Sequence, residues 1–550
     1  MDTSAQGLID QYLRLRSEAS GMVTLWDDCG RMCLTRKVDA LTTAINRTAD
    51  ATISFTPYDA AVINSVAVDA VTVNAAGCAS WITPSNARWF VYEPAPEFNR
   101  DSVKSWLSEC TEIAHRYLAA SNFYTKVHEL YIDRVVTGTA TLTCEAGKKS
   151  ALVFRVFDPG SFMICDNDEG DCDLLFRERR FTARQAVEKF GTEKVSTKVR
   201  DDAEKKPNAV HSFLQSVYPR SDAEMNRPGS AGFPFAECWV EMNEKKKAGE
   251  SGFEELPFFA SRYLRWSEFS PWGVSPAMQA LAEVRGVNFL DMLQATAAEV
   301  GVNPRIIVPQ GFSGVPDLRA GGYTTGGITR DQSPYEWMTG ARVDWMEPVI
   351  ARKVKSIENI FHVPLFAQFA QIDREITATE VRAREAEKVA RFSPAFTQLT
   401  TELLNPLLQR VFMVLLRAGK FPPPPVEALY RDAAGEVRMK YPEIVMQSRM
   451  ALALQALKKS EFADMVAMWA PLAQAGSDVL DNLDQDYVCR DLVRGSGLPA
   501  AYLRESDAVE QFRQKRAEAM QAQQQAEMAQ ELIRSRPIAE AGVKAMEDAA

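Results

Sequence analysis

Histidine and long apolar runs are both scarce in this chain, which has 550 residues but only four histidines. A membrane-spanning helix requires about 20 consecutive, mainly apolar residues. Val411–Leu416 is among the longest apolar runs and falls far short of that length. The N-terminal segment MDTSAQGLIDQYLRLRSEAS has mixed charge and lacks the apolar core of a signal peptide. The sequence therefore predicts no membrane partner.

A cysteine framework is also missing, because the nine cysteines are an odd number scattered through a long chain. Disulfide-rich secreted domains are short and carry even numbers of cysteines at regular spacings. Cys29 and Cys33 stand one helical turn apart, but no second pair completes a zinc site. The pattern predicts a reducing, cytoplasmic environment for this protein.

An excess of basic residues is absent as well. The chain has 63 Lys and Arg against 73 Asp and Glu, which gives a net charge of −10 and a pI near 5.3. Tight binding of nucleic acid requires clustered cations that neutralise phosphates. The balance argues against a protein that wraps DNA, but it does not exclude DNA that passes through a weakly interacting hole.

Signatures of catalysis are missing too. The chain contains no GxxxxGK[ST] phosphate-binding loop. Ser313 in GFSG (311–314) lacks the second glycine spacing of a nucleophile elbow. The histidines are dispersed and form no HExxH motif; they are His115, His128, His211 and His362. The sequence predicts neither an enzyme nor a bound cofactor.

One acidic segment, DNDEGDCD (166–173), raises the question of a cation site. No glutamate stands at the closing position of a twelve-residue calcium loop. We interpret the segment as a solvated hairpin turn between two strands, in preference to a cation loop. Its aspartates are Asp166, Asp168, Asp171 and Asp173. No metal site is predicted.

The most informative feature that is present is an apolar stripe between 375 and 425. Its members recur mostly at three- and four-residue steps, which predicts one long helix. Pro394 and Pro406 lie inside the pattern and predict bends, while Gly419 and four following prolines predict its end. Helices average about 11–12 residues, so this one is unusually long. The stripe comprises Val381, Val389, Phe392, Phe396, Leu399, Leu403, Leu407, Val411 and Val414.

The rest of the chain predicts an α+β fold that is mainly helical. Residues 1–130 are mostly helical in pattern, and 138–265 are rich in β-branched and aromatic residues with a period near two. Within that part, 235–244 and 253–266 are expected to pair around a Lys/Gly-rich turn. The region 440–512 is expected to be a compact helical unit, and the tail beyond it favours helix.

Between these regions, two helices flank a Gly- and Pro-rich excursion. Residues 276–301 form an Ala-rich helix, 302–345 a small loop-and-strand segment, and 345–360 a returning helix. A Pro-containing apolar loop then leads into the long bent helix. Trp266 and Trp272, on either side of Pro271, suggest a stacking platform for nucleic acid or an anchor for the first helix. The anchor is the favoured interpretation.

This order of segments resembles that of the portal, or head-to-tail connector, proteins of short-tailed bacteriophages. The most specific stretches are SNFYTKVHELYIDRVVTGTATL (121–142), RYLRWSEFSPWGVSPAMQALAEVRGVN (262–288) and 375–425. The resemblance implies a phage portal fold in a ring of about twelve copies around a channel for double-stranded DNA. It implies a wing (1–270), outward stem helix (271–301), clip (302–345), returning stem helix (346–360), tunnel loop (361–375), kinked wing helix (376–425), crown (440–512) and helical tail (513–550).

The resemblance also suggests residues with particular roles. The Ala-lined flank of the outward stem helix, with Ala295 and Ala298, is expected at the subunit interface. Candidate DNA contacts in the channel are Arg352, Lys353, Lys355 and Arg374, and the first three have the alternative of facing solvent or pairing with the next subunit. The tunnel loop would present Phe361, Phe366 and Phe369. The clip would meet the tail adaptor through Arg305, Arg319 and Arg330.

The resemblance implies that the ring occupies one capsid vertex of a virion assembled in the host cytoplasm. The implied partners are further copies of the chain, a terminase motor, a tail adaptor protein, capsid and scaffolding proteins, and internal core or ejection proteins. DNA would pass through during packaging and ejection. The alternative is a non-viral helical scaffold or adaptor without a channel, and electron microscopy of the purified particle separates the two.

Overall fold

The computed structural model describes most of residues 2–454 and a few segments beyond. The described residues are 2–34, 62–98, 100–147, 150–221, 224–225, 227–265, 267–302, 305–308, 310, 312, 317, 335–337, 345–367, 378–431, 437–454, 484, 486, 488 and 509–523. The chain divides into two compact units, Met1–Leu454 and Gln455–Ala550. In the second unit, residues 509–523 are helical, and Arg513 pairs with Asp486 at 2.5 Å.

The first part of the chain is mostly helical, as its periodicity predicts. The hydroxyl of Ser4 accepts a hydrogen bond from the Gly7 N–H and caps the first helix. A short strand, β1 (Phe90–Glu93), interrupts the series of described helices. The helices are α1 (Ala5–Glu18), α2 (Ser20–Cys33), α4 (Val66–Trp81), α5 (Asp101–Ala120) and α6 (Phe123–Thr137).

Two antiparallel sheets follow. A five-stranded sheet has the order β4-β5-β6-β7-β8, and its strands are Phe162–Asp166, Cys172–Thr182, Val210–Pro219, Phe235–Glu241 and Lys246–Phe253. A three-stranded sheet has the order β3-β2-β9, from Val153–Phe157, Thr139–Glu145 and Phe258–Arg262. The predicted pairing of 235–244 with 253–266 is wrong for most of its length. The Lys/Gly-rich segment between them is itself the partner strand β8, and β9 pairs with β2.

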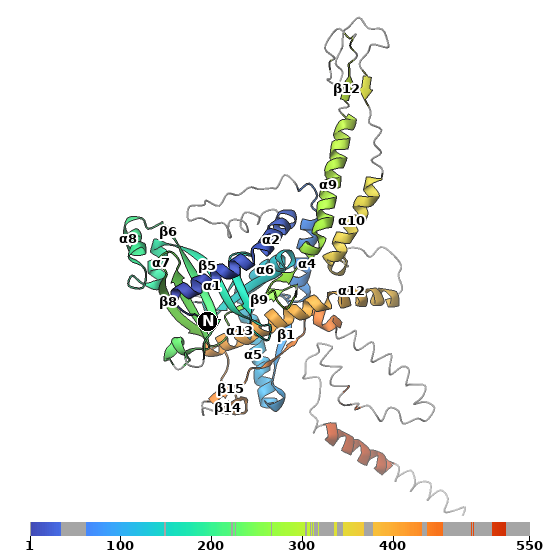
Figure 1. The fold of residues 1–550 in the computed structure, drawn as a ribbon. Helices are drawn as coiled ribbons and strands as arrows, with labels where there is room; N and C mark the ends of the chain where they lie inside the picture. Colours follow the sequence, from blue (N-terminus) through green and yellow to red (C-terminus); the bar gives the residue numbers. More distant parts are fainter. Residues whose placement is uncertain are drawn as a thin grey trace, which may run out of the picture. The chain divides into compact units, whose positions relative to one another are not determined.

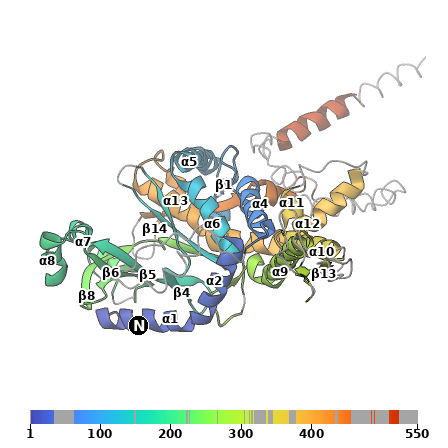
Figure 2. The same cartoon turned by 90° about the horizontal axis from the view of Figure 1, so that it is seen from above.

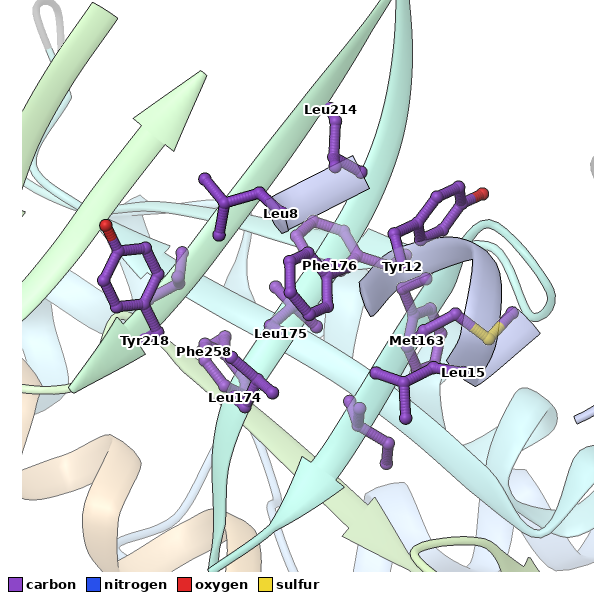
Figure 3. Close-up of a cluster of buried hydrophobic side chains, with 14 of the residues drawn as sticks. Leu8, Tyr12, Leu15, Met163, Leu174, Leu175, Phe176, Leu214, Tyr218 and Phe258 are labelled. Atoms are coloured by element: carbon purple, nitrogen blue, oxygen red, sulfur yellow. The ribbon is translucent and has the colours of Figure 1, made fainter. Parts of the chain in front are cut away.

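Helices cover both faces of the five-stranded sheet. Leu8, Tyr12 and Leu15 of α1 lie one helical turn apart and pack on one face against Phe176 and Leu214 (Figure 3). Figure 2 shows α1 extending across one face of this sheet. On the other face, α7 (Ala183–Phe190) and α8 (Thr197–Lys205) enclose a smaller cluster. That cluster contains Phe181, Ala186, Val195, Val199, Phe213, Trp239 and Ala248.

The long apolar stripe lies on a nearly continuous helix, seen as α12 and α13 in Figure 1. It consists of α12 (Ala378–Leu399), a π-helical segment η5 (Thr400–Leu404) and α13 (Asn405–Arg417). Pro406 has no N–H to donate to the carbonyl of Glu402, so the α-helical hydrogen bonding is interrupted there. The helical path continues through Pro394, so the irregular segment lies between the two prolines. Gly419, at φ 63°, follows the end of α13 as predicted.

The described part of the stripe is buried, from Val389 to Val414. By length and composition alone, Lys388–Arg417 is apolar enough to cross a membrane. Leu399, Leu403, Leu407 and Val411 are each 0% exposed inside the protein. Burial among other protein elements accounts for this apolar composition, because core helices of soluble proteins have the same character.

The predicted helical unit at 440–512 begins instead with a strand. β16 (Glu443–Met446) pairs antiparallel with β1, with Phe90 opposite Met446. A hairpin of β14 (Leu429–Arg431) and β15 (Val437–Met439) precedes it. Most of 455–508 lies outside the described residues. Among the described residues, more are in helices than in strands, which agrees with the predicted α+β, mainly helical class.

Candidate functional site: a helical hairpin and its anchor

The Ala-rich helix and the returning helix form one hairpin, with a two-stranded segment between them. α9 (Pro276–Val302) leads to β12 (Arg305–Ile307), and β13 (Tyr335–Trp337) leads back towards α10 (Met346–Ile360). Arg305 lies opposite Trp337 in the antiparallel pair. Figure 1 shows α10 returning beside α9. The predicted order of helix, excursion and helix is therefore present.

The beginning of α9 is attached to the rest of the protein by the side chain of Ser275 and by a close backbone contact at Gly273. Ser275 caps the helix, since its Oγ accepts from the Met278 N–H at 3.0 Å and donates to the Val136 carbonyl at 2.8 Å. Gly138 adopts φ 78°, and a Cβ placed there would lie 2.3 Å from the carbonyl oxygen of Gly273. Only glycine at position 138 permits these two backbone segments to lie so close together.

Trp272 adds an apolar anchor immediately before the helix. Its ring is 6% exposed and lies edge-on to Trp26, with ring centres 4.8 Å apart. Phe162 of β4 packs against it at 6.1 Å. This burial supports the anchor interpretation for Trp272, and a stacking platform for bases would require an exposed ring face. Trp266 lies outside the described residues.

Asn288 fastens the middle of α9 to the segment before α4. Its side-chain carbonyl accepts hydrogen bonds from the backbone N–H groups of Ile63 and Asn64, both at 2.9 Å. Asn64 in turn donates to Asp291 at 2.6 Å. Sequence reasoning missed this clamp, because an asparagine in an amphipathic helix gives no local sign of a partner some 225 residues away.

The two halves of α9 differ in burial. In the first half Ala277, Ala280 and Val284 are almost completely buried. In the second half Phe289 is 55% exposed and Met292 is 44% exposed. Large apolar side chains at this exposure, on consecutive turns, mark a surface suited to contact with another protein. Ala295 and Ala298 are exposed in the same half.

The three cations predicted on the returning helix have different environments. Lys353 forms an ion pair with Glu283 of α9, with 2.6 Å between Nζ and Oε2. This contact lies within one chain, and the side chain of Lys353 is partly exposed. Arg352 and Lys355 are exposed. Arg374, the fourth candidate, lies outside the described residues.

The start of the predicted tunnel loop is a packed turn. Phe361 is 0% exposed, and its carbonyl accepts from the side-chain amide of Asn74 at 2.7 Å. The turn continues as α11 (Val363–Phe366), and the ring of Phe366 lies against Gly77 and edge-on to Trp81. These two aromatic residues are therefore packed against α4. Phe369 lies outside the described residues, as do Arg319 and Arg330 of the predicted clip.

A buried charge network lies where β9 meets the long helix. Arg262, whose side chain is 2% exposed, donates from Nε to Glu402 at 2.5 Å and from Nη1 to Asp166 at 2.6 Å. Burial acts to lower the pKa of Arg262, but the carboxylates of Glu402 and Asp166 shift it upward overall. Arg265 also pairs with Asp166, at 2.8 Å. The network joins the β4–β5 hairpin, β9 and the π-helical segment.

This network corrects one prediction about the acidic turn. The hairpin between β4 and β5 is present, and Asp168 and Asp171 are exposed as a solvated turn requires. Asp166 is different, because its side chain is only 12% exposed and is paired with two arginines. Burial raises the pKa of Asp173. Sequence reasoning missed the arginine partners, which lie almost one hundred residues later in the chain.

The histidines remain dispersed in the structure. His115 stacks on Phe90 with ring centres 4.2 Å apart, and burial lowers its pKa. His211 lies 3.2 Å from Asp202, while His128 is on α6. Burial, with a smaller contribution from Arg391, lowers the pKa of His362 to about 4. They come from separate elements and form no common site with one another.

The paired cysteines considered above form no metal site in the part of the chain that the structure describes. Cys29 and Cys33 are buried, and burial raises the pKa of Cys29 to about 12 and that of Cys33 further. Ser313 lies outside the described residues. Over the part of the chain that the structure describes, no three His, Cys, Asp or Glu side chains are arranged to hold a metal ion.

Comparison with known proteins places these features in context. The family described as bacteriophage head to tail connecting protein matches residues 5–503. The chain is 25% identical over 483 residues to the "Probable portal protein" of Bordetella phage BPP-1, with 84% of each chain covered. It is 23% identical over 540 residues to the "Portal protein" of Salmonella phage epsilon15, covering 96% of this chain and 94% of that one.

Among solved structures, a chain titled "Virion of native gene transfer agent (GTA) particle" aligns with 79% of this chain and 90% of its own length. The sequence identity is 12% and the TM-score is 0.36. A score of this size carries no argument about the fold. The two sequence relatives and the family match are the informative comparisons.

Proposed function

This chain belongs to the family of bacteriophage head to tail connecting proteins, and we propose that its copies form a portal ring that conducts double-stranded DNA. The family is structural rather than enzymatic, and the predicted resemblance to portals is confirmed. The observation that carries the proposal is this family match over residues 5–503. The α9–α10 hairpin supports the proposal, because the second half of α9 exposes the apolar side chains of Phe289 and Met292.

In this proposal the hairpin is the stem of the portal and β12–β13 belong to the clip. The wing comprises residues 1–270, together with the long helix α12–α13. The crown extends over 440–512 and the helical tail over 513–550. Because Phe361 and Phe366 pack against α4, the tunnel loop is narrowed to the segment after α11, which includes Phe369 and Arg374.

In this proposal, the exposed cations of the returning helix α10 contact the DNA. Arg352 and Lys355 are exposed, whereas Lys353 is held by Glu283. Ring symmetry repeats each side chain around the axis, so one cation per chain becomes a ring of charge. DNA must slide, and the net charge of −10 opposes tight binding along the rest of the wall.

The proposed partners follow from a head-to-tail connector at a capsid vertex. They are capsid and scaffolding proteins on one side, a tail adaptor at the clip, a terminase motor during packaging, and internal core or ejection proteins. The relatives from Bordetella phage BPP-1 and Salmonella phage epsilon15 carry the printed names of portal proteins. The particle would assemble in the host cytoplasm and remain at the vertex of the virion.

Electron microscopy of the purified chain tests the ring directly. A closed ring with an axial hole, together with DNA retained in particles that contain it, is the expected result. A monomer or closed dimer at high concentration would contradict the ring and would favour the alternative, a helical scaffold or adaptor without a channel. The mass of the native particle gives the number of subunits in the same experiment.

Charge reversal in the clip tests the proposed tail contact. Replacing Arg305, Arg319 and Arg330 with Glu should weaken binding of the tail adaptor by at least about tenfold, because opposite charges across an interface become like charges. Surface plasmon resonance on intact rings measures this. Arg184→Glu, an exposed arginine on α7, is the control. Unchanged adaptor affinity in the triple variant would remove these arginines from the contact.

A further inference from the structure

A second candidate site lies away from the hairpin, in a cavity of about 610 Å³. Its walls come from the five-stranded sheet, from β2 and β3 of the three-stranded sheet, and from the helices α7 and α13. This volume is in the range of ligand-binding clefts, about 300–1,000 Å³. Its lining includes five cations, Arg155, Arg179, Lys189, Arg410 and Arg417, against two carboxylates. The cavity is therefore basic in a protein that is acidic overall.

Three of the five cations already have carboxylate partners in this chain. Arg155 pairs with Glu145 at 3.3 Å. Arg410 pairs with Glu255 at 3.1 Å, and Arg417 pairs with the same carboxylate at 2.6 Å. The partner in each ion pair is a glutamate. The other two cations, Arg179 and Lys189, have no carboxylate partner among the described residues.

Arg179 and Lys189 form no hydrogen bond or ion pair with the described residues; they contact aromatic rings instead. The ammonium of Lys189 lies 3.5 Å from the centre of the Trp239 ring, and the guanidinium of Arg179 lies 4.9 Å from that of Phe181. Arg177, two residues before Arg179 on β5, lies over the ring of Phe157, and its buried Nε has no hydrogen-bond partner in the described structure. Unmatched cations at a concave surface mark a place for an anion.

The electrostatics of the empty cavity agree with this geometry. Burial, and then the charge of Arg179, lower the pKa of Lys189 to about 8. Arg155 acts in the same direction, while the carboxylates of Glu237 and Glu145 act in the opposite one. Burial and the repulsion by Arg179 are thus the two largest causes that oppose the charge of Lys189. A bound anion would relieve that repulsion and restore the charged form of Lys189.

The aromatic rings of the wall restrict the kind of anion. Trp239 is 4% exposed and carries Lys189 over its ring, and Arg410 lies over the ring of Phe253 at 5.3 Å. A nucleobase therefore finds little ring surface on which to stack. Val414 and Ala418 give the wall an apolar part that a bare phosphate would not use. A carboxylate with apolar neighbours satisfies both parts.

We propose that this cavity binds an acidic peptide segment of a partner protein, with Arg179 and Lys189 pairing with its carboxylates. The segment would have Glu or Asp next to apolar residues, which contact the apolar part of the wall. The glutamate carboxylates that already match Arg155, Arg410 and Arg417 show the geometry that the segment would complete. This inference does not depend on whether the protein forms a ring.

Fluorescence anisotropy with a short labelled peptide of alternating Glu and Leu tests the site on the full chain. The double variant Arg179→Gln/Lys189→Gln should weaken binding by at least about tenfold, because two charge-assisted contacts are lost. Arg184→Gln, an exposed arginine at the start of α7, should leave binding unchanged. Binding to the unmodified chain should also weaken as the pH rises through about 8, since Lys189 loses its proton there.

A second double variant, in which both cations are replaced by glutamate, tests the charge preference directly. Arg179→Glu/Lys189→Glu should lose the Glu/Leu peptide and gain a Lys/Leu peptide. Equal binding of the Glu/Leu peptide to the double variant and the unmodified chain would overturn the proposal, as would no binding at all. Competition by inorganic pyrophosphate at the peptide's own potency would assign the cavity to phosphates. A changed sedimentation coefficient of the double variant without peptide would assign it to another copy of this chain. Either assignment would also overturn the proposal.

Discussion

Replacing Arg262 with methionine should lower the free energy of unfolding of the subunit by about 3 to 5 kcal/mol. The arginine is 2% exposed and bonds Glu402 and Asp166, whose side chains are 10% and 12% exposed. Methionine fills similar space but leaves Glu402 buried without its cation. Glu402 would keep the hydrogen bonds from the backbone N–H of residue 262 and from Gln398, but these do not replace its cation or its hydration.

Arg265 provides the matched control for this substitution. It bonds the same Asp166, but its side chain is 33% exposed, so Arg265→Met should cost about 1 kcal/mol or less. Urea midpoints of the disassembled subunit compare the two variants. Arg262→Met/Glu402→Leu, which removes both charges, should recover much of the loss. Equal losses for Arg262→Met and Arg265→Met would show that burial of the pair is not what stabilises this junction.

The helical part of the fold was predictable because its signals are local. The spacing from Val389 to Val414 defines one face of a helix, and that face is buried in the structure. Gly419 marks the end because only the residues around it determine its left-handed conformation. The turn at 166–173 and the order of helix, excursion and helix at 276–360 are equally local patterns.

The strands that were missed depend on distant partners. The segment KKAGESGF (246–253) has the composition of a turn, yet it is strand β8 because β7 offers an edge from Phe235 to Glu241. Glu443–Met446 becomes a strand because β1, some 350 residues earlier, pairs with it. Local propensity does not contain this information.

The candidate sites show the same division. The exposure of Ala295 and Ala298 agrees with their helical spacing, but the pair of Lys353 with Glu283 depends on how two helices cross. The cations of the basic cavity come from β3, β5, α7 and α13, so no sequence window contains them together. In the sequence, Arg262 is one of several arginines in a β-type pattern. Its role depends on Asp166 and Glu402, which only the fold brings next to it.

Replacing Ala295 and Ala298 with tryptophan should abolish ring assembly while the subunit remains folded. Both alanines are exposed on the second half of α9, so the larger side chains fit in an isolated subunit. In the proposed ring this half packs against a neighbouring subunit, where an overpacked contact costs about 1–3 kcal/mol. Closed symmetry repeats that cost at each of about twelve interfaces.

Native mass spectrometry measures the loss of rings, and circular dichroism confirms that the subunit keeps its helices. Ala119→Trp, at an exposed alanine near the end of α5, is the control for a tryptophan on a helix surface. Rings of normal mass from the Ala295/Ala298 variant would place the interface elsewhere. The exposed Phe289 and Met292 sharpen the expectation, because removing these apolar side chains from water is the favourable term that assembly through this half of α9 would supply.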